Sequence, residues 1–214
     1  MKVIRNVNET LKDDLALELQ KGSMLSIVAA DFSMYAFEAL RKELSEIEEL
    51  RFIFTDPTFI QKENSKKEKR EFYIPKINRE RRIYGTEFEV KLRNELNQKA
   101  IAKECAEWIK KKVTFKSNVG NKEITDRFIV LNDIAYYTVN SFTTVDLGCE
   151  QGNNMGVNIL KLESPASQAF IEQFAKLWQN EEELKDVTNN VISSISSAYN
   201  ENAPEFIYFV TLYN

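Results

Sequence analysis

The sequence predicts an α/β protein in which a mixed β-sheet is flanked by helices, and three observations indicate this class. Residues 24–54 have the pattern of a strand, a helix and a second strand, the unit that builds a parallel sheet. Two apolar strands, 127–131 and 134–141, are separated by Asn132-Asp133, a pair typical of a hairpin turn. Residues 86–112 carry one broad apolar stripe at helical spacing, which predicts a long helix.

The other elements follow from the same periodicities and from capping residues. Leucines four residues apart, with Asn8 as cap and Lys21-Gly22 as the end, favour a first helix. Ser164-Pro165 is typical of a helix start, because serine caps a helix and proline fits its first turn. In chain order we expect a helix over 8–20, a strand over 24–30, a helix carrying Tyr35 to Ile47, a strand over 50–54, the helix over 86–112, strands over 113–116, 127–131, 134–141 and 155–160, and helices over 164–178, over 181–199 and from Pro204.

A basic stretch interrupts this pattern. Residues 61–82 hold nine basic and four acidic side chains and show no apolar period, so we expect an extended excursion from the sheet over 61–84. It could follow a nucleic-acid backbone, with Phe72 or Tyr73 stacked on a base, or it could be a solvated loop whose lysines pair with its own glutamates. The residues expected to contact phosphate are Lys66, Lys67, Lys69, Arg70, Arg79, Arg81 and Arg82.

Charge is divided unevenly along the chain. Residues 1–61 have a net charge of -4, residues 62–132 of +8 and residues 133–214 of -8. The basic middle could meet a polyanion, or it could dock on the acidic last third of the same chain.

A polar, glycine-containing loop follows a predicted strand in VNSFTTVDLGCEQGNN, residues 139–154. Its backbone N–H groups could hold phosphate, or it could be a connecting loop whose Gly and Asn residues supply unusual dihedral angles. Asp31 follows the first buried strand, where open α/β sheets bind ligands, although a helix cap is the commoner role and the one we expect. Asp146, near this loop, could also be a functional residue, although an Asp in such a position more often binds the local backbone.

The absence of histidine excludes several chemistries. With no histidine in 214 residues, the chain has no Ser-His-Asp or Cys-His nucleophile, no histidine base and no histidine metal site. Neither GxxxxGK[ST] nor GxGxxG occurs, so no phosphate loop for ATP is expected. The two cysteines form no CxxC, and no apolar run approaches the roughly 20 residues of a membrane span. We therefore expect a cytoplasmic chain without metal, cofactor or membrane contact.

The chain resembles the phospholipase D-like fold in SIVAADFSMYAFEALRKEL, in FIFTDPTF, and in the run from DRFIVL through YYTVNSFTTVDLG to NNMGVNIL and FIEQFAKLW. Phospholipase D-like nucleases carry His-x-Lys, then Gly-Ser-x-Asn or Ser-Ser-Asn-Phe-Thr, then a Glu-containing strand and a helix ending near Leu-Trp. Residues 140–143 match the second element, and 125–127 fall at His-x-Lys, without the histidine and with arginine for lysine. The resemblance implies no catalytic residue but a vestigial phosphate pocket of Arg127, Asn140, Ser141, Thr143 and Asn154.

A resemblance over nearly the whole chain is to the N-terminal region of large bacterial superfamily 2, Swi/Snf-like helicases, which carry a phospholipase D-like domain ahead of the ATPase motor. This resemblance is carried by three runs: REFYIPKINRERRIYGTEFEVKLRNELNQKAIAKECAEWIKKKVTFKSN, FTTVDLGCEQGNN and NENAPEFIYFVTLYN. It implies a phospholipase D-like domain over 1–180 and a helical segment over 181–214 that leads to the motor. The apolar helix that stops at Asn214 fits a parent chain that continues, and ATP and Mg would belong to that motor.

The function that these resemblances imply is an accessory, non-catalytic nucleic-acid-binding domain of an ATP-dependent DNA helicase, itself a hydrolase. Its partners would be DNA and the motor domain of the same polypeptide. Two alternatives stay open: a protein-interaction module that docks on the motor or forms a homodimer, and an active nuclease with a replaced nucleophile.

Overall fold

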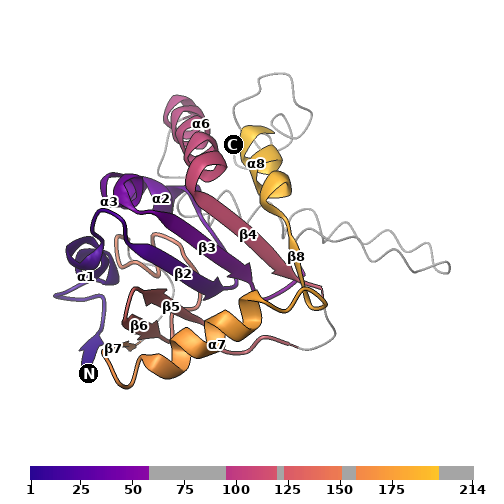
Figure 1. Ribbon diagram of the computed structural model, residues 1–214. Helices are drawn as coiled ribbons and strands as arrows, with labels where there is room; N and C mark the ends of the chain where they lie inside the picture. Colours follow the sequence, from indigo (N-terminus) through magenta and orange to yellow (C-terminus); the bar gives the residue numbers. More distant parts are fainter. Residues whose placement is uncertain (58–94, 120–122, 151–157, 198–214) are drawn as a thin grey trace, which may run out of the picture.

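The computed structural model describes residues 1–57, 95–119, 123–150 and 158–197 (Figure 1). Its strands are β1 (Lys2–Ile4), β2 (Met24–Ala29), β3 (Glu49–Phe54), β4 (Val113–Asn118), β5 (Phe128–Leu131), β6 (Ile134–Tyr137), β7 (Ile159–Leu162) and β8 (Leu184–Asp186). Its helices are α1 (Leu11–Glu18), α2 (Met34–Ala39), α3 (Arg41–Glu46), α6 (Glu95–Lys112), α7 (Gln168–Trp178) and α8 (Thr188–Ser197).

The strands form one mixed sheet in the order β1-β7-β6-β5-β2-β3-β4-β8. The three central strands β2, β3 and β4 are parallel, and the other neighbours pair antiparallel. Ala29 pairs with Phe54, and Val28 pairs with Phe128 on the antiparallel β5. The C-terminal ends of β2, β3 and β4 therefore lie beside the N-terminal end of β5 and the C-terminal end of β6. We call this side of the sheet the carboxyl edge.

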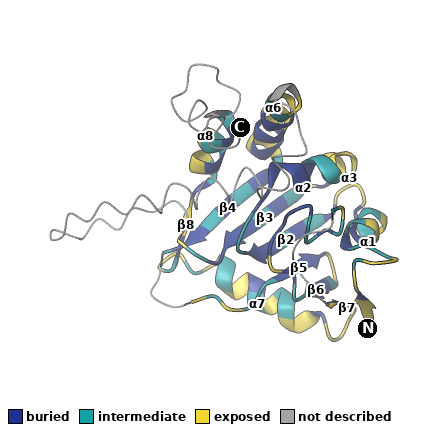
Figure 2. Ribbon diagram, turned by 180° about the vertical axis from the view of Figure 1, so that it is seen from behind, coloured by how far each residue is buried: buried dark blue, intermediate teal, exposed yellow. Residues whose placement is uncertain are grey.

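Apolar side chains cover both faces of the sheet. The larger cluster joins one face to α1, α2, α3, α6 and α8, and the smaller one packs Phe174 of α7 against Val28, Ile53 and Phe128. Figure 2 shows the strands largely buried and the outer sides of the helices exposed. Near the carboxyl edge the rings of Phe32 and Phe142 stack with their centroids 6.0 Å apart.

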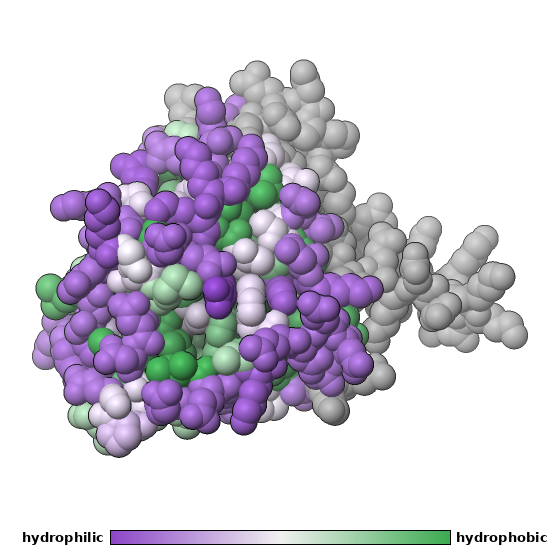
Figure 3. Space-filling model, viewed as in Figure 1, coloured by the Kyte–Doolittle hydropathy of each residue, from purple (hydrophilic) through white to green (hydrophobic). Residues whose placement is uncertain are grey.

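The face seen in Figure 3 is mostly hydrophilic, with hydrophobic side chains in small recessed patches. Within the part of the chain that the structure describes, no helix is both long enough and apolar enough to cross a bilayer.

The central predictions are confirmed. Residues 24–54 contain two parallel strands, and Asn132, with φ of 52°, turns the chain between the antiparallel β5 and β6. The long helix is confirmed from Glu95 to Lys112, while residues 86–94 and the helix expected from Pro204 lie outside the described residues.

Several element boundaries were predicted wrongly: among them, the strand expected over 134–141 ends at Tyr137, and the helix expected from Tyr35 to Ile47 is divided into α2 and α3. The first helix is capped by Thr10 and not by Asn8, because Thr10 and Asp13 form a reciprocal capping box. The Ser164-Pro165 pair does not begin α7; residues 163–167 form a separate turn, and the helix begins at Gln168. The strand expected over 155–160 is confirmed at its end, where β7 begins at Ile159; Asn158 is outside the strand, and residues 155–157 lie outside the described part.

The helix expected over 181–199 is confirmed only from Thr188 to Ser197, because Leu184–Asp186 is a strand. Leu184 pairs with Asn118 at the edge of the sheet and buries its side chain in the smaller cluster. The Asp186 carboxylate then accepts a 2.8 Å hydrogen bond from the Thr188 backbone N–H at the start of α8. Pairing with β4 thus determines the conformation of this stretch, against its local helical preference.

An ion network around the buried Asp14 carboxylate joins α1 and β1 to β6 and β7. It is formed by Asp14, Lys161, Glu18, Tyr136 and Lys2. Lys161 Nζ lies 2.7 Å from Asp14 Oδ1 and 2.7 Å from Glu18 Oε1. Tyr136 donates its hydroxyl proton to Asp14 at 2.7 Å, and Lys2 Nζ lies 2.8 Å from the other Asp14 oxygen. Both oxygens of a side chain that is only 2% exposed are therefore compensated, as a buried carboxylate requires.

Candidate functional site

The carboxyl edge brings Ser141 and Asp31 together from positions 110 residues apart. Phe32 and Phe142 form an isolated parallel bridge, and the Phe142 N–H donates to the Asp31 carbonyl at 2.8 Å. This backbone pairing places Ser141 Oγ 2.8 Å from Asp31 Oδ2, to which it donates. Asn140 is exposed beside them, and its carbonyl accepts from the Ala30 N–H at 3.0 Å.

The role expected for Asp31, a helix cap, is wrong. The N-cap of α2 is Ser33, whose Oγ accepts a 3.1 Å hydrogen bond from the Tyr35 N–H. Asp31 lies two residues before this cap, and its carboxylate accepts a hydrogen bond from Ser141. Sequence reasoning placed Asp31 at the ligand-binding end of the strand, but only the fold reveals its partner.

The hydroxyl groups of the following loop also face carboxylates. Thr143 Oγ1 donates to Asp146 Oδ2 at 2.6 Å and accepts from the Asp146 N–H at 3.2 Å. Thr144 Oγ1 donates to Glu150 Oε2 at 2.8 Å. An incoming phosphate would meet negative charge at each hydroxyl, and like charges at short distance repel. The loop as folded is therefore poorly suited to hold an anion through its hydroxyls.

Among the described residues at this edge, Arg127 and Thr55 each carry a buried side-chain atom without a hydrogen-bond partner. Arg127 directly precedes β5, and its buried Nε has no hydrogen-bond partner among the described residues. Thr55 directly follows β3, is 2% exposed, and its Oγ1 likewise has none there. A buried donor without a partner costs about 1–3 kcal/mol, so such atoms are the natural contacts for a ligand.

The loop is tied to the N-terminal segment through Asn6. The Asn6 amide donates to the Asp146 carbonyl at 2.8 Å, and its oxygen accepts from the Leu11 N–H at 2.8 Å. Gly148 packs against the same side chain, with φ of 78°. Nothing in the sequence indicated the role of Asn6, whereas a glycine in the loop was a visible signal of an unusual backbone conformation.

The structure places four of the five expected pocket residues, Arg127, Asn140, Ser141 and Thr143, at or next to the carboxyl edge. The fifth, Asn154, lies outside the described residues, as do all seven basic residues expected to contact phosphate. Among the residues that are described, no group of three or more acidic or cysteine side chains is arranged to hold a metal ion.

This mixed sheet, flanked by helices on both faces, is the phospholipase D-like fold. A solved structure with the same arrangement is that of phosphatidylserine synthase from Haemophilus influenzae Rd KW20, with a TM-score of 0.51 and 12% sequence identity. The match covers 98% of this chain and 45% of that chain, so the sequence spans less than half the length of the synthase. At this identity the likeness shows the fold alone. No protein-family profile matches the chain, and no curated protein matches it.

Proposed function

We propose that this chain is a non-catalytic, nucleic-acid-binding domain that serves as an accessory to an ATP-dependent DNA helicase. The observation that carries the proposal is a phospholipase D-like fold in a chain without a single histidine. Nucleic acid is the phosphodiester that fits a chain whose middle third has a net charge of +8. The link to a helicase motor rests on the sequence resemblance.

The missing histidine removes the covalent step. Active phospholipase D-like nucleases form a phosphohistidine, and position 125, where the resemblance places that histidine, is a threonine. A threonine hydroxyl cannot replace imidazole as a nucleophile without an adjacent base. Ser141 has a carboxylate acceptor in Asp31, yet that contact also keeps a negative charge 2.8 Å from the oxygen that would have to approach phosphate.

The distribution of charge indicates where nucleic acid binds. At the carboxyl edge, carboxylates accept hydrogen bonds from the hydroxyls of Ser141, Thr143 and Thr144. Arg127 is the basic residue that the resemblance places there. Affinity for a polyanion comes mainly from neutralising phosphates with lysine and arginine. We therefore assign the main contact to the basic stretch at 66–82, with Arg127 as an additional contact.

Reversing four charges in the basic stretch tests this assignment. We expect the Lys66→Glu, Lys67→Glu, Lys69→Glu and Arg70→Glu variant to bind duplex DNA at least tenfold more weakly at about 50 mM salt. The slope of log affinity against log salt should fall by up to about 3.6, at about 0.9 for each lost phosphate contact. Fluorescence anisotropy with a labelled duplex measures both quantities.

The control reverses two lysines, Lys176 and Lys185, which are exposed on α7 and β8, and is compared with the fourfold variant per charge reversed. This control should change affinity much less, since it reverses positive charges of the same kind in another part of the chain. Unchanged DNA affinity in the fourfold variant would contradict the proposed function and direct attention to a protein partner.

A further inference from the structure

Asp31 follows the end of β2 at the carboxyl edge, between the ends of two neighbouring strands. β2 ends at Ala29, with β3 on one side and β5 on the other. Thr55 directly follows β3 and Arg127 directly precedes β5, and each has a buried side-chain atom without a hydrogen-bond partner among the described residues. The strand order therefore places the Asp31 carboxylate between an unpartnered hydroxyl and an unpartnered guanidinium nitrogen.

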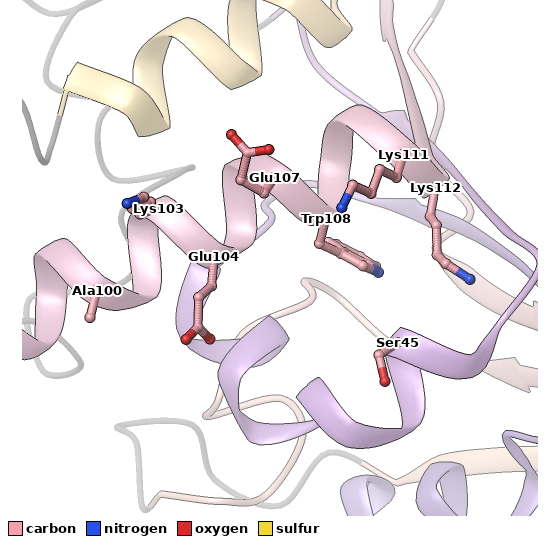
Figure 4. Close-up of a pocket in the computed structure, with 8 residues that line it drawn as sticks. All are labelled: Ser45, Ala100, Lys103, Glu104, Glu107, Trp108, Lys111 and Lys112. Atoms are coloured by element: carbon pink, nitrogen blue, oxygen red, sulfur yellow. The ribbon is translucent and has the colours of Figure 1, made fainter.

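The lack of a partner sets Arg127 apart from the lysines of the open groove between α3 and α6, which has a volume of about 640 Å³. In that groove Lys103 and Lys111 flank the Glu107 carboxylate (Figure 4). A hydrogen bond from Lys110, and then the charges of these two lysines, lower the pKa of Glu107. The Arg127 side chain, by contrast, makes no hydrogen bond or ion pair with any residue that the structure describes. It can therefore bind an anion without giving up an existing contact.

The main chain holds Asp31 where its carboxylate reaches Ser141. The Ala30 N–H donates to the Asn140 carbonyl at 3.0 Å, and the Phe142 N–H donates to the Asp31 carbonyl at 2.8 Å. These bonds fix the backbone around Asp31, and Ser141 Oγ donates to Asp31 Oδ2 at 2.8 Å. A serine hydroxyl has one proton to donate, so Ser141 cannot donate to a phosphate oxygen while it donates to Asp31.

We propose that Asp31 is a specificity-determining residue that keeps phosphate away from Ser141 at the carboxyl edge. Its carboxylate takes the hydrogen bond that a phosphate oxygen would accept from Ser141, and its charge repels an incoming anion. Without that charge, the guanidinium of Arg127 and the hydroxyls of Ser141 and Thr55 are donors of the kind that bind phosphate. This inference rests on the proposed function, and it limits the carboxyl edge of the unmodified chain to a weak contact with nucleic acid through Arg127.

Asp31→Asn tests the proposal through a gain of binding by the full chain. Asparagine keeps the shape of the side chain, removes its charge and supplies an amide that can donate to phosphate. The variant should bind labelled duplex DNA about tenfold more tightly at about 50 mM salt, because a like charge is removed at short range. The slope of log affinity against log salt should steepen by about 0.9, the value of one added phosphate contact. Asp133→Asn is the matched control, since it removes an exposed charge from the turn at the other end of β5, and it should change both quantities much less.

Inorganic phosphate tests the same residue without nucleic acid. A ligand that binds the folded chain raises its melting temperature, so thermal denaturation in about 20 mM phosphate is compared with denaturation in chloride of equal ionic strength. Asp31→Asn should be stabilised by phosphate, and adding Arg127→Gln to this variant should abolish the stabilisation. The unmodified chain should show no stabilisation by phosphate that depends on Arg127.

The outcomes separate the role of Asp31 from the proposed function. Phosphate binding by Asp31→Asn, with no DNA binding by either form, overturns the proposed function and leaves the role of Asp31 standing. Equal binding of DNA and phosphate by Asp31→Asn and the unmodified chain, or a gain that survives Arg127→Gln, overturns the role of Asp31. Stabilisation of the unmodified chain by phosphate that Arg127→Gln abolishes overturns it as well, and this result does not depend on the folding of an Asp31 variant.

Discussion

Replacing Lys161 with methionine is expected to lower the free energy of unfolding by about 3–5 kcal/mol, the usual cost of leaving a buried charge without its partner. Lys161 is 7% exposed and lies 2.7 Å from both Asp14 and Glu18. Because methionine keeps most of the side-chain volume, the loss of stability measures the removal of the charge and not a change in packing. Urea denaturation of the two proteins at neutral pH measures the difference.

Lys2→Met is the matched control for this prediction. Lys2 also contacts Asp14, but its side chain is 42% exposed, so water can replace much of what the contact supplies. Its loss should cost clearly less than the loss of Lys161. Equal effects of the two substitutions, or a Lys161→Met variant as stable as the parent, would contradict the view that the buried pair fastens α1 to the sheet.

The pH dependence of this difference follows from the two pKa shifts. Burial acts to raise the pKa of Asp14, but hydrogen bonds from Lys161, Lys2 and Tyr136 outweigh it and hold that pKa below its ordinary 3.8. Burial acts to lower the pKa of Lys161, but its bonds to Asp14 and Glu18 hold that pKa above its ordinary 10.5. The contribution of Asp14 is therefore lost as pH falls through its lowered pKa, and that of Lys161 as pH rises through its raised pKa. The gap between parent and Lys161→Met should be widest between 3.8 and 10.5 and narrow outside that window.

Gly148→Ala is expected to destabilise the protein by about 2–4 kcal/mol. A left-handed backbone costs a non-glycine residue roughly 1–2 kcal/mol, and φ at Gly148 is 78°. A Cβ there would lie 2.7 Å from Cγ and Oδ1 of Asn6, which must then move. That movement disturbs the hydrogen bonds of Asn6 to Asp146 and Leu11, each worth about 1 kcal/mol.

Gly22→Ala separates the two parts of that cost. Gly22 has φ of 83°, but a Cβ there would meet no atom within 4 Å. It should therefore lose only the backbone part, about 1–2 kcal/mol. Thermal denaturation of both variants tests the comparison, and a Gly148→Ala variant no less stable than Gly22→Ala would show that Asn6 does not fix the loop.

The sequence alone was sufficient to predict an element where its local pattern and the tertiary structure favour the same conformation. The buried runs at 24–30 and 50–54 pair in parallel as expected, since both are apolar on the two faces that helices cover. The helix predicted from an apolar stripe is confirmed over the described part of α6. Cys105 and Ile109 of that stripe are buried and lie at helical spacing. The phospholipase D-like fold is shown by the solved synthase structure, whereas the link to a helicase remains a proposal.

Sequence reasoning failed where a distant partner decides the local conformation. Leu184–Asp186 is polar and helix-prone, yet it becomes a strand because β4 offers an edge 66 residues earlier in the chain, where Asn118 pairs with Leu184. The contact of Ser141 with Asp31 spans 110 residues, and that of Tyr136 with Asp14 spans 122. Neither pair leaves a pattern in the local sequence. The sequence shows that these polar residues are present, but it does not show which residues they contact.

Binding of labelled single- and double-stranded DNA to the 214-residue chain, followed by fluorescence anisotropy at about 50 and about 200 mM salt, tests the central claim most directly. The proposed function predicts binding at the lower salt that falls steeply at the higher, with the DNA left uncleaved. Absence of binding at both concentrations, or cleavage of the DNA, would contradict a non-catalytic nucleic-acid-binding domain.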